Sequence, residues 1–258
     1  MSRIIDLTKM IQYNKDDPKI MQVKIRTITR AMGKFQIMLM GLPLRLFPED
    51  FKGWTADRVT IPTHATTHLD APFHYCDISE GKKAKTAEEI PLELCYGDGV
   101  VIDMSHKADN DMVTPEDIKQ ALEKTGSSIE PGTIVLIRTD RDKYMGTKEY
   151  PNVGPGVSLE ATEWLLDQGV RMMGTDQWTW DMPLSGQIRR AKETNNSELF
   201  WEAHILGRKR EHYHAEQLTN LAALPPHGFK VCMFPMKLRG ASGAPIRAVA
   251  IIADKTVH

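Results

Sequence analysis

Residues 62–75 read Pro-Thr-His-Ala-Thr-Thr-His-Leu-Asp-Ala-Pro-Phe-His-Tyr, and they determine what kind of fold the chain needs. The polar side chains of this stretch are separated by even intervals: His64, His68, Asp70 and His74. Alternate residues of an extended strand point to one face, whereas a helix would scatter them around its cylinder. The prolines and threonines also favour extended or turning chain. The stretch therefore predicts three imidazoles and a carboxylate on one face of a strand.

This group of side chains suits a divalent metal ion. A flat strand would place His64 and His68 roughly 13 Å apart, whereas each ligand nitrogen of a zinc ion lies about 2.0–2.1 Å from the metal. We therefore expect a bend or bulge around residues 65–67 if both imidazoles bind one ion. The alternative is that these histidines are ordinary polar residues of a strand and loop, which suits a single histidine better than this constellation.

The composition excludes several classes of protein. Charged residues make up 26% of the 258 residues and the net charge is −1, so the sequence offers no basic face for nucleic acid. Three widely spaced cysteines form neither a disulfide framework nor a CxxC metal site. No signal-like apolar segment opens the sequence, and no run approaches the ~20 apolar residues of a membrane span. We expect a cytoplasmic protein with a small-molecule substrate and no membrane partner.

The middle of the chain alternates strands with helices. Apolar runs predict strands at residues 99–103, 133–138 and 170–173. Thr114 and Pro115 begin a helix that should run to about Lys124 and end at Gly126. Ser158 begins another helix, which Gly169 closes. This alternation predicts an α/β fold with a mixed sheet and outer helices, in a single domain that spans residues 1–258.

The flanking segments are more varied. We expect strands at residues 3–7, 20–28, 59–61, 229–238 and 246–253, a helix at 198–206, and a solvated loop at 77–87. Residues 31–51 have no firm assignment. They fit either a short helix and loop that closes over a site or plain core.

A second group of candidate ligands lies far along the chain. His204 is expected near the end of a helix, and Glu216 follows after an Arg/Lys-rich segment. On its own this is a weak signal, because a histidine on an amphipathic helix is usually a surface or core residue and a glutamate is usually solvated.

Both segments resemble one family. The first is similar to the His-x-Gly-Thr-His-x-Asp-Ala-Pro-x-His signature of the cyclase family of kynurenine formamidase-like, metal-dependent hydrolases. The matching residues are His64, Thr67, His68, Asp70, Ala71, Pro72 and His74. The second resembles the family's His…Glu-x-Leu-x-Asn-Leu block through His204, Glu216, Leu218, Asn220 and Leu221.

The resemblance implies a swivelling β/β/α-type fold and hydrolysis of cyclic or linear amides and lactones by a metal-activated water. It implies one ion on His64, His68 and Asp70, and a second ion on Asp70, His204 and Glu216. The ions would be zinc, or alternatively manganese, with one or two per chain. It further implies that His74 is the proton shuttle and that the chain forms a homodimer or tetramer.

Four other residues have a bearing on this reading. Thr66 stands where the family has glycine, so the loop must follow a route that threonine tolerates. His212 and His214 are additional imidazoles near Glu216, for which we expect surface or packing roles rather than metal binding. Trp178 is a candidate wall of the substrate cavity, where a flat aromatic or unsaturated substrate would suit it.

Other functions stay open or are disfavoured. A catalytically inactive metal-binding protein of the same fold is the main alternative. A serine hydrolase is disfavoured because Ser242 lacks a Gly-x-Ser-x-Gly context. A dinucleotide enzyme is disfavoured because no Gly-x-Gly-x-x-Gly follows a strand. The substrate itself is not predicted: formylkynurenine, isatin-like lactams, dienelactones and polyketide-type rings all fit.

Overall fold

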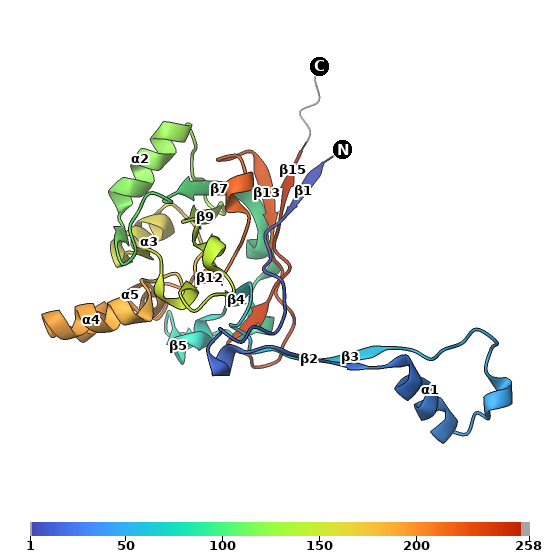
Figure 1. Cartoon of the computed structure of the whole chain (residues 1–258). Helices are drawn as coiled ribbons and strands as arrows, with labels where there is room; N and C mark the ends of the chain where they lie inside the picture. The colour runs from blue at the N-terminus through green and yellow to red at the C-terminus, as the bar shows by residue number, and fades with distance from the viewer. Residues whose placement is uncertain (1, 254–258) are drawn as a thin grey trace, which may run out of the picture.

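A nine-stranded mixed sheet organises the computed structural model, which describes residues 2–253 (Figure 1). The strand order is β1-β15-β13-β7-β9-β11-β12-β4-β14. The strands are β1 (Arg3–Asp6), β4 (His68–Asp70), β7 (Tyr96–Asp103), β9 (Ile134–Arg138), β11 (Met172–Thr175), β12 (Tyr213–Glu216), β13 (Phe229–Cys232), β14 (Gly243–Pro245) and β15 (Val249–Ile252). The four strands β7, β9, β11 and β12 run parallel, and every other pairing is antiparallel.

Short helices lie against one face of this sheet (Figure 1). They are α2 (Pro115–Thr125), α3 (Leu159–Asp167) and α5 (Glu202–Leu206), whereas α4 (Leu184–Thr194) projects outward (Figure 1). The predicted starts of α2 and α3 are confirmed: Thr114 accepts a hydrogen bond from the Asp117 amide, and Ser158 accepts one from the Ala161 amide. Gly126 ends α2 in the left-handed conformation, as the sequence predicts.

The central strands are apolar on both faces. Val100 and Ile102 pack towards the helices together with Ile118, whereas Val101 packs into a second core on the other face. That second core joins residues from strands at both ends of the sheet, such as Leu69 and Ala250, so the sheet curls around it. Because alternate residues serve two cores, β7 and β9 read as continuous apolar runs.

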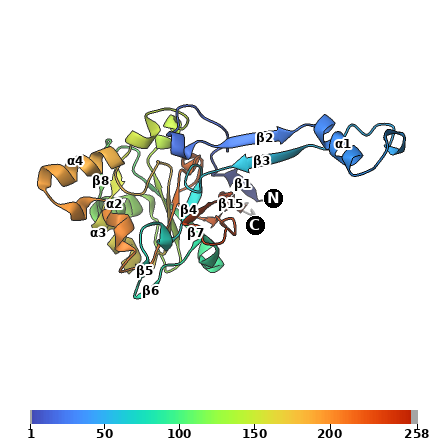
Figure 2. The same cartoon turned by 90° about the horizontal axis from the view of Figure 1, so that it is seen from below.

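An arm projects from the body of the molecule (Figures 1 and 2). It contains the antiparallel pair β2 (Lys24–Ile28) and β3 (Ala56–Thr60), and beyond it α1 (Arg30–Leu39). The ambiguous residues 31–51 are therefore neither core nor a cover over the chain's own site. The arm presents many exposed apolar side chains, including Phe35, Leu39 and Met40.

Several boundaries differ from the sequence predictions. Residues 19–21 form a 3₁₀ turn rather than the start of a strand, and the predicted loop at 77–87 contains a short hairpin of β5 (Ile78–Ser79) and β6 (Lys82–Lys83). The predicted helix at 198–206 breaks at Trp201, whose φ is 56°. The helix α4 was not predicted, and the small parallel pair of β8 (Met112–Val113) and β10 (Gly156–Val157) was not predicted either.

Candidate metal centre

The histidine motif bends instead of forming one long strand. Only His68–Asp70 is strand, residues 63–67 form turns and bends, and Pro72–His74 is a 3₁₀ turn. The expectation of a continuous strand is thus wrong, while the expected bend around residues 65–67 is present. Proline at the start of the 3₁₀ turn ends the strand pairing because it has no amide hydrogen. The two bends bring the rings of His64 and His74 into a stack with centroids 4.0 Å apart.

The bend follows a route that Thr66 tolerates. Thr66 is not among the described residues with positive φ, so its backbone avoids the region that glycine would have opened. Its carbonyl oxygen accepts a hydrogen bond from His68 Nδ1 at 2.6 Å. Since a carbonyl can only accept, Nδ1 carries the proton, and the lone pair of Nε2 faces the interior of the site.

Strand pairing brings the two predicted ligand groups together. In the register of β12 and β4, Glu216 lies opposite His68, and the two side chains approach to 3.7 Å. His204, on α5, places its Nε2 atom 3.5 Å from Asp70 Oδ2 and 3.4 Å from Glu216 Oε1. His64 Nδ1 lies 2.7 Å from Asp70 Oδ1. All five predicted ligands therefore meet at one place, with Asp70 at the centre.

Asp181 orients His204. Its carboxylate accepts hydrogen bonds from the amides of Ala203 at 3.0 Å and His204 at 3.2 Å, and a short contact joins it to His204 Nδ1. A proton held on Nδ1 in this way leaves Nε2 free to bind a cation. Glu216 is fixed in a similar manner, because its Oε1 accepts a hydrogen bond from the Trp180 amide at 2.7 Å.

The electrostatics of the cluster are those of a site built for a cation. Burial opposes ionisation of Asp70, but the imidazoles of His68, His64 and His74 hold its pKa well below the usual value. Burial likewise opposes protonation of His204, yet its bonds to Asp181, Asp70 and Glu216 raise its pKa well above 6.5. His74 differs, because burial lowers its pKa to about 4. At neutral pH His74 is therefore uncharged.

Buried polar atoms without partners show that the residues present fit a metal ion. Both ring nitrogens of His214 are buried and lack a hydrogen-bond partner within residues 2–253. Such groups cost free energy unless something satisfies them. The buried oxygens of Asp70 face the imidazole nitrogens of His64, His68 and His204 at 2.7, 3.2 and 3.5 Å. Imidazole nitrogens and carboxylate oxygens in this number are the donor set of a divalent cation such as zinc or manganese.

Sequence reasoning missed some residues of this centre. His214 is fully buried rather than on the surface, and it belongs with Asp70, His204 and Glu216 to one group of potential metal ligands. Its position two residues before Glu216 on a strand was a usable signal, because alternate residues share a face. A second such group contains His64, Asp70 and His74.

An indole other than the predicted one covers the imidazoles. The ring of Trp201 stacks on His204 with centroids 4.9 Å apart and lies 5.2 Å from His74. Its positive φ marks a backbone conformation that non-glycine residues seldom adopt. Trp178 instead packs edge-on against Tyr150 at 5.6 Å, and Lys9 lies near both rings.

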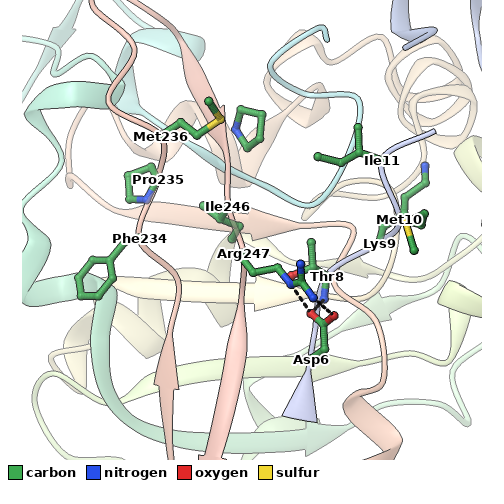
Figure 3. Close-up of a pocket in the computed structure, with 11 residues that line it drawn as sticks. Asp6, Thr8, Lys9, Met10, Ile11, Phe234, Pro235, Met236, Ile246 and Arg247 are labelled. Carbon is green, nitrogen blue, oxygen red and sulfur yellow. Dashed lines mark hydrogen bonds and ion pairs between the residues drawn. The ribbon is translucent and has the colours of Figure 1, made fainter. Parts of the chain in front are cut away.

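Two hollows lie near the centre. A groove of about 490 Å³ begins at His74 and is also lined by Phe73, Tyr75, Cys76, Asp77, Ile78 and Arg208. A larger pocket, of about 570 Å³, lies between residues 8–11 and the segments 234–236 and 245–247 (Figure 3). Among the described residues, none of the potential ligands lines that second pocket. It is mainly apolar, and the ion pair of Asp6 with Arg247 stands at its edge (Figure 3).

Comparison with known proteins identifies one family and relatives that are named as hydrolases. The family model described as "Putative cyclase" matches residues 5–182. An isatin hydrolase of Roseibium aggregatum is 28% identical over 206 residues, covering 73% of this chain and 72% of the relative. A kynurenine formamidase of Salinibacter ruber is 27% identical over 201 residues, covering 78% of this chain and 82% of the relative. These relatives are hydrolases.

Solved structures show the same architecture. Isatin hydrolase A from Ralstonia solanacearum superposes with a TM-score of 0.74 at 25% identity, covering 98% of this chain and 92% of that one. An isatin hydrolase bound to the product analogue thioisatinate has a TM-score of 0.73 at 22% identity, covering 97% of this chain and 92% of that one. The curled mixed sheet with few helices is thus a shared fold, as predicted.

Proposed function

Because the chain belongs to the cyclase family, we propose that it is a metal-dependent hydrolase that cleaves a small cyclic or linear amide or lactone. The observation that carries this proposal is the buried cluster of imidazoles and carboxylates with unpaired polar atoms. Relatives are named isatin hydrolase and kynurenine formamidase, so lactams and formamides are the first substrates to test.

The proposed ligands are those of the two motifs. His64, His68 and Asp70 would hold one ion, and Asp70, His204 and Glu216 would hold a second, with zinc or manganese as the candidates. A divalent ion bound there supplies an acidified water and polarises a carbonyl oxygen. Asp181 and the carbonyl oxygen of Thr66 keep the Nδ1 protons of His204 and His68 in place, so that each Nε2 atom would be free to bind an ion.

We assign proton transfer to His74. Its ring is uncharged at neutral pH, stacks on His64 and borders the open groove, so it can take a proton inside the site and exchange it with solvent. The proton would then pass to the leaving nitrogen or oxygen. Trp201 and, as the sequence suggested, Trp178 are the proposed walls for a flat substrate.

The test couples metal analysis to hydrolysis. The purified chain is assayed for bound metal and for turnover of a lactam, formamide and lactone panel, with and without a chelator. We expect at least one ion per chain and chelator-sensitive hydrolysis. His74→Gln should keep the ion and lose most turnover. A bound ion with no turnover of any substrate would support the inactive metal-binding alternative instead.

One observation favours a second candidate, a serine hydrolase. Ser242 Oγ lies 2.9 Å from His64 Nε2, while His64 Nδ1 lies 2.7 Å from Asp70 Oδ1. This is the order of groups in a Ser-His-Asp triad. The unpaired nitrogens of His214 have no role in such a triad, so we rank it second. Chelator-resistant turnover that Ser242→Ala abolishes would reverse this ranking.

We also propose that two copies associate through the arm. Phe35, Leu39 and Met40 are 57%, 72% and 84% exposed, and large apolar side chains exposed close together on one element often mark an interface. Sedimentation of the purified chain should therefore show a dimer or tetramer, and Phe35→Glu should shift it towards the monomer. A wild-type chain that stays monomeric at high concentration would refute this. Within residues 2–253, no helix has the length and apolarity to cross a bilayer, and the cytoplasmic location stays a prediction.

A further inference from the structure

His214 is a buried imidazole that the two ligand motifs leave without a role. It is 0% exposed, and neither ring nitrogen has a hydrogen-bond partner within residues 2–253. A buried histidine normally donates or accepts at least one hydrogen bond, since an unsatisfied polar atom in the interior costs about 1–3 kcal/mol. Something absent from the protein chain itself must therefore satisfy this ring.

The strand register places His214 on the face of the metal centre. Along β12, Tyr213 and Ala215 point into the apolar core, so His214 and Glu216 point to the opposite face. The strand register pairs Ala215 with Leu69 and Glu216 with His68. One further step along these antiparallel strands sets His214 beside Asp70.

The neighbouring side chains hold the ring there. The indole of Trp180 stacks on it with centroids 5.2 Å apart and an interplanar angle of 11°. The ring of His204 meets it edge-on at 4.7 Å. One ligand atom from each of Asp70, His204, His214 and Glu216 lies within 4.8 Å of the others, which is compact enough for a single ion.

We propose that His214 is a metal ligand, the fourth protein ligand of the ion held by Asp70, His204 and Glu216. This inference rests on the proposed function. Four protein ligands fill a tetrahedral shell of the kind that structural zinc sites have, whereas catalytic sites keep three. The ion that faces substrate is then the one on His64, His68 and Asp70, with His74 beside it. The two halves of the centre thus differ: one is closed by the protein and the other is open.

The alternative is that His214 only packs against Trp180, and two matched variants separate these roles. His214→Phe keeps an aromatic ring on the indole but cannot bind metal. His212→Phe makes the same change at the neighbouring buried imidazole, which donates through Nδ1 to the Arg210 carbonyl and lies outside both ligand groups. Zinc per chain is measured by mass spectrometry after equilibrium dialysis, and the affinity of each ion by chelator competition.

We expect the wild type and His212→Phe to bind two zinc ions. His214→Phe should lose one of them, or bind it more than about 100-fold more weakly, since the loss of a direct ligand should exceed the 10–100-fold cost of losing a residue that only orients one. Unchanged zinc affinity in His214→Phe would overturn the assignment. A wild type that binds no divalent ion would refute the proposed function itself, and this result differs from the one that refutes only the role of His214.

A second variant covers the case in which His214→Phe does not fold. His214→Cys replaces the imidazole by a thiolate, which is also a zinc and cobalt ligand. When the folded variant is loaded with Co²⁺, a near-ultraviolet thiolate-to-cobalt absorption band should appear that the wild type lacks. Absence of that band in the Co²⁺-loaded variant would refute contact between position 214 and the ion.

Discussion

Replacing Asp181 by asparagine tests how the ring of His204 is oriented in the proposed metal centre. The carboxylate is buried and accepts from two backbone amides and from His204 Nδ1. Asparagine keeps the shape, and its oxygen can still accept from a backbone amide. Its NH₂ group, however, would face the Nδ1 proton. Relief of that clash moves the proton to Nε2, the atom that should bind the ion.

The expected losses of metal affinity and of stability follow from these contacts. Loss of an orienting carboxylate next to a ligand histidine typically costs 10–100-fold in metal affinity, which is about 1.4–2.8 kcal/mol. Hydrogen bonds to a charged group contribute about 1.5–3 kcal/mol, so the metal-free variant should also unfold more easily by about that amount. Zinc affinity by chelator competition and urea unfolding in the absence of metal measure the two effects separately.

Asp176→Asn is the matched control. Asp176 is also buried, and it also accepts from two backbone amides, those of Thr139 and Asp140. Burial raises its pKa to about 7, and none of its described contacts reaches the cluster, so this variant makes the same chemical change at a site away from the proposed ligands. Zinc affinity should stay unchanged in this variant. Equal zinc affinity in Asp181→Asn and the wild type would refute the orienting role of Asp181.

Three further outcomes are expected. Gly243→Ala should lower both the stability, by about 1–3 kcal/mol, and the zinc occupancy, because a Cβ there would lie 2.6 Å from His64 Cε1 and 2.9 Å from the Leu69 carbonyl oxygen; urea unfolding and metal analysis measure these effects. Trp201→Leu should raise KM for a flat substrate more than it lowers kcat, and steady-state kinetics would contradict a wall role if KM stayed constant. Burial lowers the pKa of His212 from 6.5 to about 4, so the unfolded chain takes up a proton below pH 6.5 that the folded chain excludes. Stability should therefore fall as the pH drops from 6.5 to 4, and in His212→Phe the metal-free chain should take up about one proton fewer on unfolding.

The sequence predicted the parts of the fold that local chemistry determines. Capping residues located α2 and α3, and continuous apolar runs located the buried parallel strands. The arm escaped prediction because α1 packs against residues of the arm itself, such as Trp54, and projects away from the body of the molecule (Figure 2). From the sequence, its apolar residues fitted either plain core or a segment that closes over a site, whereas the structure exposes many of them. Whether an apolar helix is buried in the core or exposed on an arm depends on tertiary contacts and not on local propensity.

The site was predicted as a set of residues but not as an arrangement. The even spacing of the histidine motif suggested one strand, whereas Thr63–Thr67 and Pro72–His74 turn the chain twice. Those turns depend on contacts with remote segments, such as the hydrogen bond from Thr67 Oγ1 to the Gln217 carbonyl oxygen. The sequence did not indicate Trp201 as the indole over the imidazoles for the same reason. Trp201 lies over His204 because the chain breaks the helix at Trp201, and the neighbouring residues give no sequence signal for that break.

The pairing of β4 with β12 joins segments about 150 residues apart, and this separation has a consequence for biosynthesis. A nascent chain displays His64, His68 and Asp70 to the cell long before His204 and Glu216 leave the ribosome. Any cation captured in that interval would be held by only part of the proposed ligand set, and it would exchange more readily with competing ions until the remaining ligands arrive. If the proposed centre holds a metal ion, its identity would therefore depend on the supply of ions when β12 pairs with β4, and not on the supply during early synthesis.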